Sequence, residues 1–360
     1  MILVFTSNEK GGIIQLAITV TEKLYKLGRE VRCFIPTIAK ASIPEYLQDY
    51  IIKYEKVKSP NPYNIHAKHV AAKLLEFNPK LVWYVDSSVF SSQVGINLAG
   101  RVKQALIMHD AGTSHSSYNT SLKQRFKLFF ERKTRELCNK NIDWIITCSP
   151  NSKIVYGQLY PSQQNKIYML PLGPHMPEVR TLCPIEVKGI SDYFMFFGRI
   201  DKYKGIDVLL KSYTKWTGDR KLVIAGGGQL QPEEIKMASS DSRVVLINRF
   251  IKDEEMPYLF MNARALVLPY KDATQSGILP IAYMCQKPVV CSNVIGISQF
   301  VVEGSTGKIC SSEQDYVNAF TLLENNEQLN LFSRNARRYY ESNLDWNKNI
   351  SQMLKDFNIE

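Results

Sequence analysis

Short apolar runs alternate with amphipathic stretches along this chain, and the whole alternation occurs twice. Five runs lie in the first half, at residues 2–5, 31–34, 81–85, 105–108 and 144–147. Five more lie in the second half, at residues 194–197, 222–225, 244–247, 265–268 and 288–291. Runs without polar alternation are typical of parallel strands that helices cover on both faces. Two successive βαβ arrays therefore predict an α/β protein with two doubly wound, Rossmann-like domains.

The chain of 360 residues is also longer than one ordinary hydrophobic core requires. Four prolines between residues 171 and 184 indicate a linker between the two arrays. We predict a first domain over residues 1–174 and a second over 175–341. Three helical stretches, roughly 312–324, 326–341 and 345–358, end the sequence, and we expect them to be mainly polar and exposed.

Composition excludes several classes of protein. The chain is 45% hydrophobic and 22% charged, as in a globular rather than a disordered protein. No window approaches the ~20 consecutive apolar residues of a membrane span, and the first residues, MILVFTSNEKGG, lack the pattern of a secretory signal. The seven cysteines are scattered and form no CxxC pair, which favours a reduced cytoplasmic compartment without structural zinc.

The positive charge is concentrated in the first half. Residues 1–180 contain 24 Lys and Arg against 13 Asp and Glu, whereas residues 181–360 contain 21 of each. This asymmetry indicates an anionic partner for the first half. The predicted helix at 121–140 combines an apolar side with Lys123, Lys127 and Arg132, which fits either an anionic bilayer or a core-facing helix with a solvated back. Nucleic acid is not expected, because aromatic residues are not interleaved with the basic ones.

Glycine-rich and charged loops follow the predicted strands, at the edge where open α/β sheets bind ligands. Each loop also has a simpler structural interpretation. The three glycines 226–228 fit a tight turn, and His109 could cap a turn with Asp110. Residues 274–277 could cap a helix or hold a phosphate at its N-terminus. The loop residues concerned are Gly11, Gly12, His109, Asp110, His115, Gly198, Arg199, Lys204, Gly227, Gln275, Ser276 and Gly277.

The most informative loop lies in the segment YFMFFGRIDKYKGIDVLL, residues 193–210. A buried strand is followed by Gly198, which permits a sharp turn, and then by Arg199 and Lys204 before a helix. These cations and the backbone amides suit a phosphate or diphosphate, although a solvated basic loop has the same pattern. The sequence has no DxD, HExxH or cysteine cluster, so we expect Arg, Lys and amides, without a metal, to neutralise such an anion.

The same segment resembles the signature of family-four retaining glycosyltransferases, which have the glycosyltransferase-B architecture. SNEKGGIIQLAITVTEKLYKLGREVRCF, DWIITCS, MLPLG, LVIAGGG, FIKDEEMPYLFMNARALVLPY and KPVVCSNVIGISQFVVEGSTGKI resemble further family segments, in the family's order. The resemblance implies two Rossmann-like domains facing each other across a cleft. LDWNKNI resembles the family's last helix, so residues 342–360 are expected to cross back to the first domain.

The resemblance also implies functions for the loops. Arg199 and Lys204 would stabilise the leaving diphosphate of a nucleotide-diphosphate sugar, and His109 would lie beside the transferred sugar. Donor binding would involve Gly12, Gly198, Gly227, Gln275, Ser276 and Gly277, and the backbone at Phe250 and Ile251 would contact the base. Gly11, Asp110 and His115 are the acceptor-side candidates.

The sequence departs from the family at two glutamates that are commonly separated by seven residues. Ala273 and Ile281 occupy these positions, and DATQSGILPIAY resembles a variant branch. Either Gln275 and Ser276 bind sugar hydroxyls and phosphate as neutral groups, or activity is lost. We favour the first, because Arg199, Lys204, His109 and both glycine loops are intact.

We therefore expect a cytoplasmic, retaining, metal-independent glycosyltransferase without a cofactor, acting in surface polysaccharide or glycolipid biosynthesis. Its partners would be a nucleotide-diphosphate sugar, a lipid-linked or glycan acceptor and, peripherally, the inner face of an anionic membrane. The alternatives are a non-catalytic sugar-binding partner on the same fold and a nucleotide-sugar epimerase or hydrolase.

Overall fold

The chain forms two units, each with its own internal contacts. Unit 1 comprises Met1–Pro171 and Trp346–Glu360, and unit 2 comprises Leu172–Asp345. The predicted boundaries, at 174/175 and 341/342, lie close to these divisions. The computed structural model describes residues 1–57, 59, 61, 63–109, 122–176 and 180–359, without the side chains at 122–128, 130 and 132.

In the described part of unit 1, seven parallel strands form one sheet in the order β3-β2-β1-β4-β5-β6-β7. The five predicted runs are its inner strands, and each is almost entirely buried. The sequence did not reveal β3 and β7, which are the two edges and are half-exposed. The strands are β1 (Ile2–Phe5), β2 (Val31–Pro36), β3 (Ile51–Tyr54), β4 (Leu81–Tyr84), β5 (Lys103–Met108), β6 (Trp144–Thr147) and β7 (Ile167–Met169).

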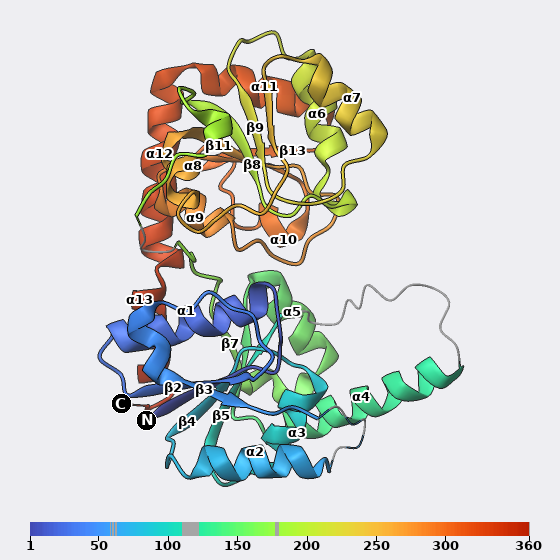
Figure 1. The fold of residues 1–360 in the computed structure, drawn as a ribbon, viewed down its shortest axis with the longest axis vertical. Helices are drawn as coiled ribbons and strands as arrows, with labels where there is room; N and C mark the ends of the chain where they lie inside the picture. Colours follow the sequence, from blue (N-terminus) through green and yellow to red (C-terminus); the bar gives the residue numbers. More distant parts are fainter. Residues whose placement is uncertain (58, 60, 62, 110–121, 177–179, 360) are drawn as a thin grey trace. The chain divides into compact units, whose positions relative to one another are not determined.

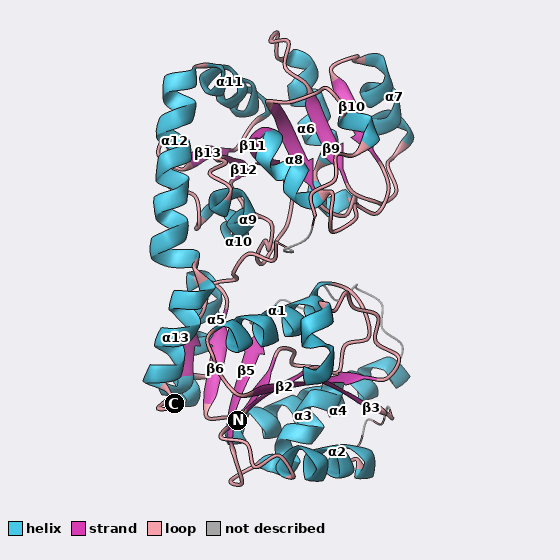
Figure 2. Cartoon of the chain, turned by 60° about the vertical axis from the view of Figure 1, so that its left-hand side comes forward, coloured by secondary structure: helices cyan, strands magenta, loops and turns pink. Residues whose placement is uncertain are grey.

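Helices cover both faces of this sheet (Figure 1). One face contributes Leu3, Phe5 and Val82 to a core with apolar residues of α2, α3 and α4. Helix α1 covers the other face (Figures 1 and 2). The helical elements are α1 (Gly12–Lys26), η1 (Glu45–Tyr50), α2 (Ile65–Leu75), α3 (Val89–Leu98), α4 (Leu122–Asn141), α5 (Pro150–Leu159), η2 (Pro161–Lys166) and α13 (Trp346–Asp356).

Unit 2 contains, within the described residues, a six-stranded parallel sheet in the order β10-β9-β8-β11-β12-β13 (Figure 2). The five predicted runs are again strands, and the one not predicted, β13, is an edge strand that starts with a glycine. The strands are β8 (Tyr193–Phe197), β9 (Leu222–Ala225), β10 (Val244–Ile247), β11 (Ala263–Leu268), β12 (Val289–Ser292) and β13 (Gly307–Cys310).

The helices of unit 2 pack around these strands in one large apolar core. The expectation that the last three helices are mainly exposed is wrong for two of them: α11 buries Tyr316, Phe320 and Leu323, and α13 buries Ile350 and Met353. The helical elements are η3 (Ile185–Val187), η4 (Lys202–Lys204), α6 (Ile206–Lys215), α7 (Pro232–Ser240), α8 (Met256–Asn262), α9 (Leu279–Met284), α10 (Ile295–Ser298), α11 (Glu313–Glu324), α12 (Asn326–Tyr339) and η5 (Tyr340–Leu344), a π-helix.

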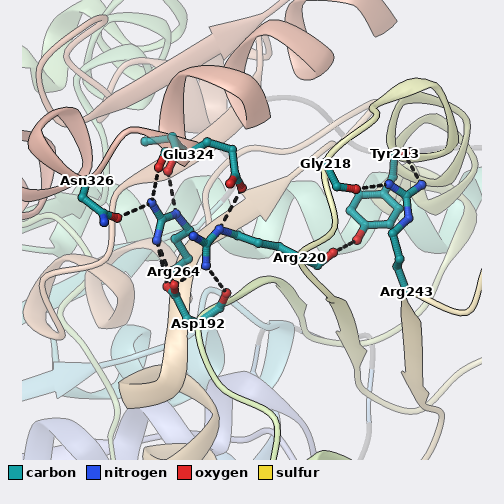
Figure 3. Close-up of polar contacts among 9 residues, drawn as sticks. Asp192, Tyr213, Gly218, Arg220, Arg243, Arg264, Glu324 and Asn326 are labelled. Atoms are coloured by element: carbon teal, nitrogen blue, oxygen red, sulfur yellow. Dashed lines mark hydrogen bonds and ion pairs between the residues drawn. The ribbon is translucent and has the colours of Figure 1, made fainter.

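A polar network closes the amino end of the unit 2 sheet (Figure 3). Arg264, buried near the start of β11, donates to both carboxylate oxygens of Asp192 at 3.0 and 2.9 Å. It also donates to the carbonyls of Leu323 and Glu324 at the end of α11 and to the side chain of Asn326. These contacts satisfy helix-end carbonyls that have no partner within the helix. The network therefore has a structural role, at the end of the strands opposite to the candidate site.

Helix α13 belongs to unit 1 although it follows unit 2 in the sequence. Its first residue, Trp346, is buried and donates from Nε1 to the carbonyl of Pro171 at 2.6 Å. Farther along, Phe357 stacks on Trp144 of β6 with ring centroids 4.0 Å apart. A hydrogen bond to Pro171 and an aromatic stacking contact with β6 thus hold the last segment of the chain in unit 1.

Candidate functional site

The loops at the carboxyl ends of β8, β9 and β11 approach one another so closely that side chains do not fit between them. A Cβ atom at Gly226 would lie 1.9 Å from the carbonyl oxygen of Gly198. A Cβ at Gly205 would lie 1.9 Å from the carbonyl oxygen of Pro269, and Gly205 is left-handed, with φ 69°. Glycine has no Cβ atom, so it permits the close backbone contact at both positions, and it readily adopts the left-handed φ of Gly205. These positions fix the loops that carry the predicted anion-binding residues.

Arg199 and Lys204 lie on the loop and turn that follow β8, in contrasting environments. The Arg199 side chain is 69% exposed and pairs with Asp201 at 3.2 Å. Lys204 is half-buried, and its Nζ lies 3.6 Å from the centre of the Tyr270 ring and 5.0 Å from that of Tyr203. Burial and the nearby Arg199 charge lower the pKa of Lys204 to about 8, although Asp201 opposes the shift. The structure thus brings two cations close enough to interact, one open to solvent and one held by aromatic rings.

The loop after β9 lies against the loop after β10. A Cβ at Gly227 would lie 3.3 Å from the amide nitrogen of Phe250, so the backbones nearly touch. The Phe250 side chain is 81% exposed, whereas Ile251 is buried. Arg249 fixes this loop through ion pairs with Glu186 and Glu255, at 2.8 and 2.7 Å. The predicted base-contacting backbone is therefore rigidly supported and lies next to the glycine loop.

The loop of residues 271–278 does not cap a helix, which was one of the two interpretations of its sequence. Helix α9 begins only at Leu279, after an N-cap residue Ile278 without a side-chain cap, so residues 274–277 do not cap it. Ser276 instead accepts a weak hydrogen bond from the Ile278 amide at 3.4 Å. A Cβ at Gly277 would meet nothing within 4 Å. The open space beside Gly277 leaves room for a ligand, and ligand contact at Gln275, Ser276 and Gly277 stays a prediction.

The positions of the two absent glutamates differ in exposure. Ile281 is fully buried in the core of unit 2. Ala273 is partly exposed, and its carbonyl oxygen would lie 2.0 Å from a Cβ at Gly296. Ile281 therefore contributes to the hydrophobic core, whereas Ala273 lies where the backbone passes close to Gly296.

In unit 1 the loop after β1 is held by a buried carboxylate that the sequence interpretation missed. Asp86 accepts hydrogen bonds from Thr6 Oγ1 at 2.7 Å and from the Ser7 amide at 2.8 Å. It also accepts from the Ser88 amide at 2.9 Å and from Ser91 Oγ at 2.8 Å. Burial by itself raises the pKa of Asp86, but these donors together lower it below its usual value. Its position directly after the run 81–85 was the available signal.

The held loop leads to Gly11 and Gly12, at the start of α1. Gly11 is the N-cap residue, with φ 84°, a conformation that favours glycine. A Cβ at either position would meet nothing within 4 Å. Space is therefore present beside both glycines, and their contact with a ligand stays a prediction.

His109 follows β5, and its Nε2 lies 2.8 Å from the carbonyl oxygen of Val85, after β4. A carbonyl only accepts, so Nε2 carries the proton of this hydrogen bond. The structure thus places His109 at the same sheet edge as the Asp86 cluster. Asp110 and His115 lie outside the described residues.

Two further sequence features concern metals and membranes. Among the residues that the structure describes, no group of three or more His, Cys, Asp or Glu side chains could hold a metal ion. Of the helices in the described ranges, none has the length and apolar character needed to cross a bilayer. Helix α4 matches the predicted basic helix, but its Lys123, Lys127 and Arg132 side chains are not described.

Comparison with known proteins identifies the class. Residues 191–326 match the family described as "Glycosyl transferases group 1". Over its whole length the fold is similar to that of HepE from Anabaena, solved in complex with UDP, with a TM-score of 0.76, 16% identity and 99% of both chains covered. It is also similar to WaaG, a glycosyltransferase involved in lipopolysaccharide biosynthesis, with a TM-score of 0.67, 15% identity and 98% and 99% of the chains covered.

In sequence, the chain is 22% identical over 347 residues to an uncharacterized glycosyltransferase of Methanocaldococcus jannaschii, covering 88% of each. The prediction of two Rossmann-like domains with the glycosyltransferase-B architecture is confirmed. The fold and the matched domain define the chain as a glycosyltransferase. More particularly, the part of unit 2 that matches the group 1 glycosyl transferase family, residues 191–326, includes Arg199, Lys204 and the loops around them.

Proposed function

We propose that this glycosyltransferase moves a sugar from a nucleotide-diphosphate sugar to an acceptor hydroxyl, with retention at the anomeric carbon. The observation that carries the proposal is the pair of cations, Arg199 and Lys204, that meet at the carboxyl end of β8. A leaving diphosphate gains negative charge in the transition state, and preorganised cations stabilise that charge. HepE was solved with UDP and with UDP-glucose, which makes UDP-glucose the first donor to test.

The proposed donor site uses backbone as much as side chains. Gly198 and Gly227 allow the phosphates and nucleoside to approach the loops, and the backbone at Phe250 and Ile251 contacts the base. Gln275, Ser276 and Gly277 bind sugar hydroxyls and phosphate, in place of the absent glutamates. This assignment is supported by the open space at Gly277 and by the rigid support of the Phe250 loop.

Unit 1 is proposed to bind the acceptor. Gly12 approaches the donor phosphates or the acceptor, Gly11 lies on the acceptor side, and His109 lies beside the transferred sugar. We propose a front-face reaction in which the leaving phosphate helps to deprotonate the acceptor. Cationic side chains would replace a metal ion, so transfer should persist in EDTA. Asp110 and His115 remain acceptor-side predictions.

The central experiment measures transfer from a panel of nucleotide sugars, beginning with UDP-glucose, to candidate glycan and lipid acceptors. Arg199→Ala and Lys204→Ala should each lower turnover roughly ten- to thousandfold. Lys211→Ala removes an exposed cation of α6 in the same unit and serves as the matched control. Full turnover by both site variants would overturn the anion site. Conversion of the donor without any acceptor would favour an epimerase or hydrolase instead.

We further propose that the enzyme acts in the cytoplasm, on a precursor of a surface polysaccharide or glycolipid, in peripheral contact with an anionic membrane. The excess charge of the first half supports this proposal. Flotation with anionic vesicles should retain the wild-type chain at low salt and release it at high salt, with neutral vesicles as control. Retention that is unchanged after substitution of Lys123, Lys127 and Arg132 would contradict a role for this helix.

A further inference from the structure

The side chain of Lys204 lies against two aromatic rings. Its Nζ is 3.6 Å from the centre of the Tyr270 ring and 5.0 Å from that of Tyr203. The two rings are inclined at 73° with centroids 6.3 Å apart, so they form two walls around the ammonium group. The face of an aromatic ring carries partial negative charge and attracts a cation at such distances. The nearer ring, Tyr270, therefore makes the stronger contact.

The Tyr270 ring is also the more rigid of the two walls. Tyr270 is 1% exposed, whereas Tyr203 is 37% exposed. Ser292, at the end of β12, donates its hydroxyl to the Tyr270 carbonyl. The amide of Lys271, the next residue, donates to the Tyr203 carbonyl at 2.7 Å and so joins the loop after β11 to the turn that carries Lys204. The ring and the ammonium are thus fixed relative to one another by backbone contacts.

We propose that Tyr270 is a positioning residue for donor binding: its ring face holds the Lys204 ammonium in its charged form beside Arg199, ready for the diphosphate. This inference rests on the proposed function of Lys204. The residue acts through Lys204 and needs no contact with the substrate itself. Its aromatic ring is the required feature, and its hydroxyl is not.

The balance of charges around Lys204 shows why the ring matters. Burial and the charge of Arg199 both disfavour the ammonium form and lower the pKa of Lys204 to about 8, while Asp201 favours that form. These groups lie on the loop after β8, Tyr203 faces the ammonium from η4 and Tyr270 faces it from the loop after β11. Asp201 is also paired with Arg199, so the ring adds stabilisation of the ammonium to the part that Asp201 supplies.

The sign of the expected pH effect follows from this arrangement. Diphosphate affinity should be full below the pKa of Lys204 and should decline as pH rises through about 8. A leucine at position 270 keeps the site apolar but removes the ring, so the pKa of Lys204 should fall further. Loss of a cation–π contact of this kind lowers the ratio of charged to neutral Lys204 by roughly 2- to 30-fold. Affinity should then begin to decline at a lower pH than in the wild-type protein.

The test uses the full chain and UDP as the probe, titrated calorimetrically between pH 6.5 and 9.5. We expect Tyr270→Phe to match the wild-type protein. Tyr270→Leu should bind UDP more weakly near pH 7.5, by up to roughly eightfold, because fewer Lys204 side chains are charged, and its decline should shift to lower pH. In a Lys204→Ala background, Tyr270→Leu should have no further effect, because the partner of the ring is already absent.

Wild-type affinity and pH profile in Tyr270→Leu, or an equal loss in the Lys204→Ala background, would overturn the positioning role and leave the anion site standing. Undiminished UDP affinity in Lys204→Ala itself would instead overturn the anion site and this inference with it. Thermal melting checks that each variant folds, and Tyr270→Met replaces the leucine variant if that variant does not. As a second measure, the pH dependence of Lys204 acetylation, followed by peptide mass spectrometry, should shift to lower pH in the ring-deleted variant.

Discussion

Replacing Asp86 by asparagine should loosen the β1 loop of unit 1 while changing side-chain volume very little. Each carboxylate oxygen of Asp86 accepts two hydrogen bonds, one oxygen from Thr6 and Ser7 and the other from Ser88 and Ser91. In asparagine one of these oxygens becomes an NH₂ group, which then faces two donors. At least two charge-assisted hydrogen bonds are lost, at about 1.5–3 kcal/mol each.

Relief from burying a charge offsets part of this loss, so we expect the free energy of unfolding of unit 1 to fall by about 2–4 kcal/mol. Urea unfolding, followed separately for the two units, measures the change, and Asp49→Asn, at an exposed position of the same unit, is the control. A midpoint for Asp86→Asn equal to that of the control would refute the reasoning.

The pH dependence provides a second check on Asp86. Its folded-state pKa is lowered, so its stabilising contribution is complete above the unfolded value of about 3.9 and is lost as pH falls through the lower folded value. The stability difference between wild type and Asp86→Asn should therefore be constant near neutrality and shrink below about pH 4. A difference that stays constant into strong acid would contradict the assigned hydrogen bonds.

Three further substitutions probe the other contacts, and thermal melting checks each of them. Arg264→Lys keeps the charge but loses the planar fork of five donors, so we expect a loss of about 2–4 kcal/mol in unit 2; an unchanged melting temperature would contradict it. Gly205→Ala should destabilise by at least about 1–3 kcal/mol through its left-handed backbone alone, and by more through the contact with Pro269; a neutral result would refute the tight loop packing. Trp346→Phe should cost about 1–3 kcal/mol, because the buried Pro171 carbonyl loses its donor; equal stability would show that another group replaces it.

The sequence predicted the central strands because their apolar runs are continuous, but it missed three of the four edge strands in the described residues. The fourth edge strand, β10, was predicted because its sequence, VVLI, is apolar throughout. Strand β3 has half-exposed isoleucines, β7 has three residues and β13 begins with a glycine, so none of them contains a long buried run. Edge strands are covered less completely than central ones, and local sequence patterns detect burial rather than hydrogen-bonded pairing.

The sequence also predicted part of the candidate site. Residues that follow strands, such as Arg199 and His109, could be placed because parallel strands share one carboxyl edge. Tyr270 and Asp86 were missed, although each follows a predicted strand, because their functions depend on partners distant in sequence. The helix start was misplaced because no side chain caps α9. Local sequence patterns therefore could not predict contacts that form only when distant segments pack together.

The return of α13 to unit 1 has a consequence for synthesis on the ribosome. Unit 2 is continuous in sequence, so all of its residues emerge before α13 does. Unit 1 must wait, with the surface around Trp144 and the Pro171 carbonyl uncovered, until the segment from Trp346 to Phe357 has been made. Domains generally fold as units during synthesis. The domain that begins first is thus completed last, and a released chain truncated before residue 346 should contain a folded unit 2 beside an incomplete unit 1.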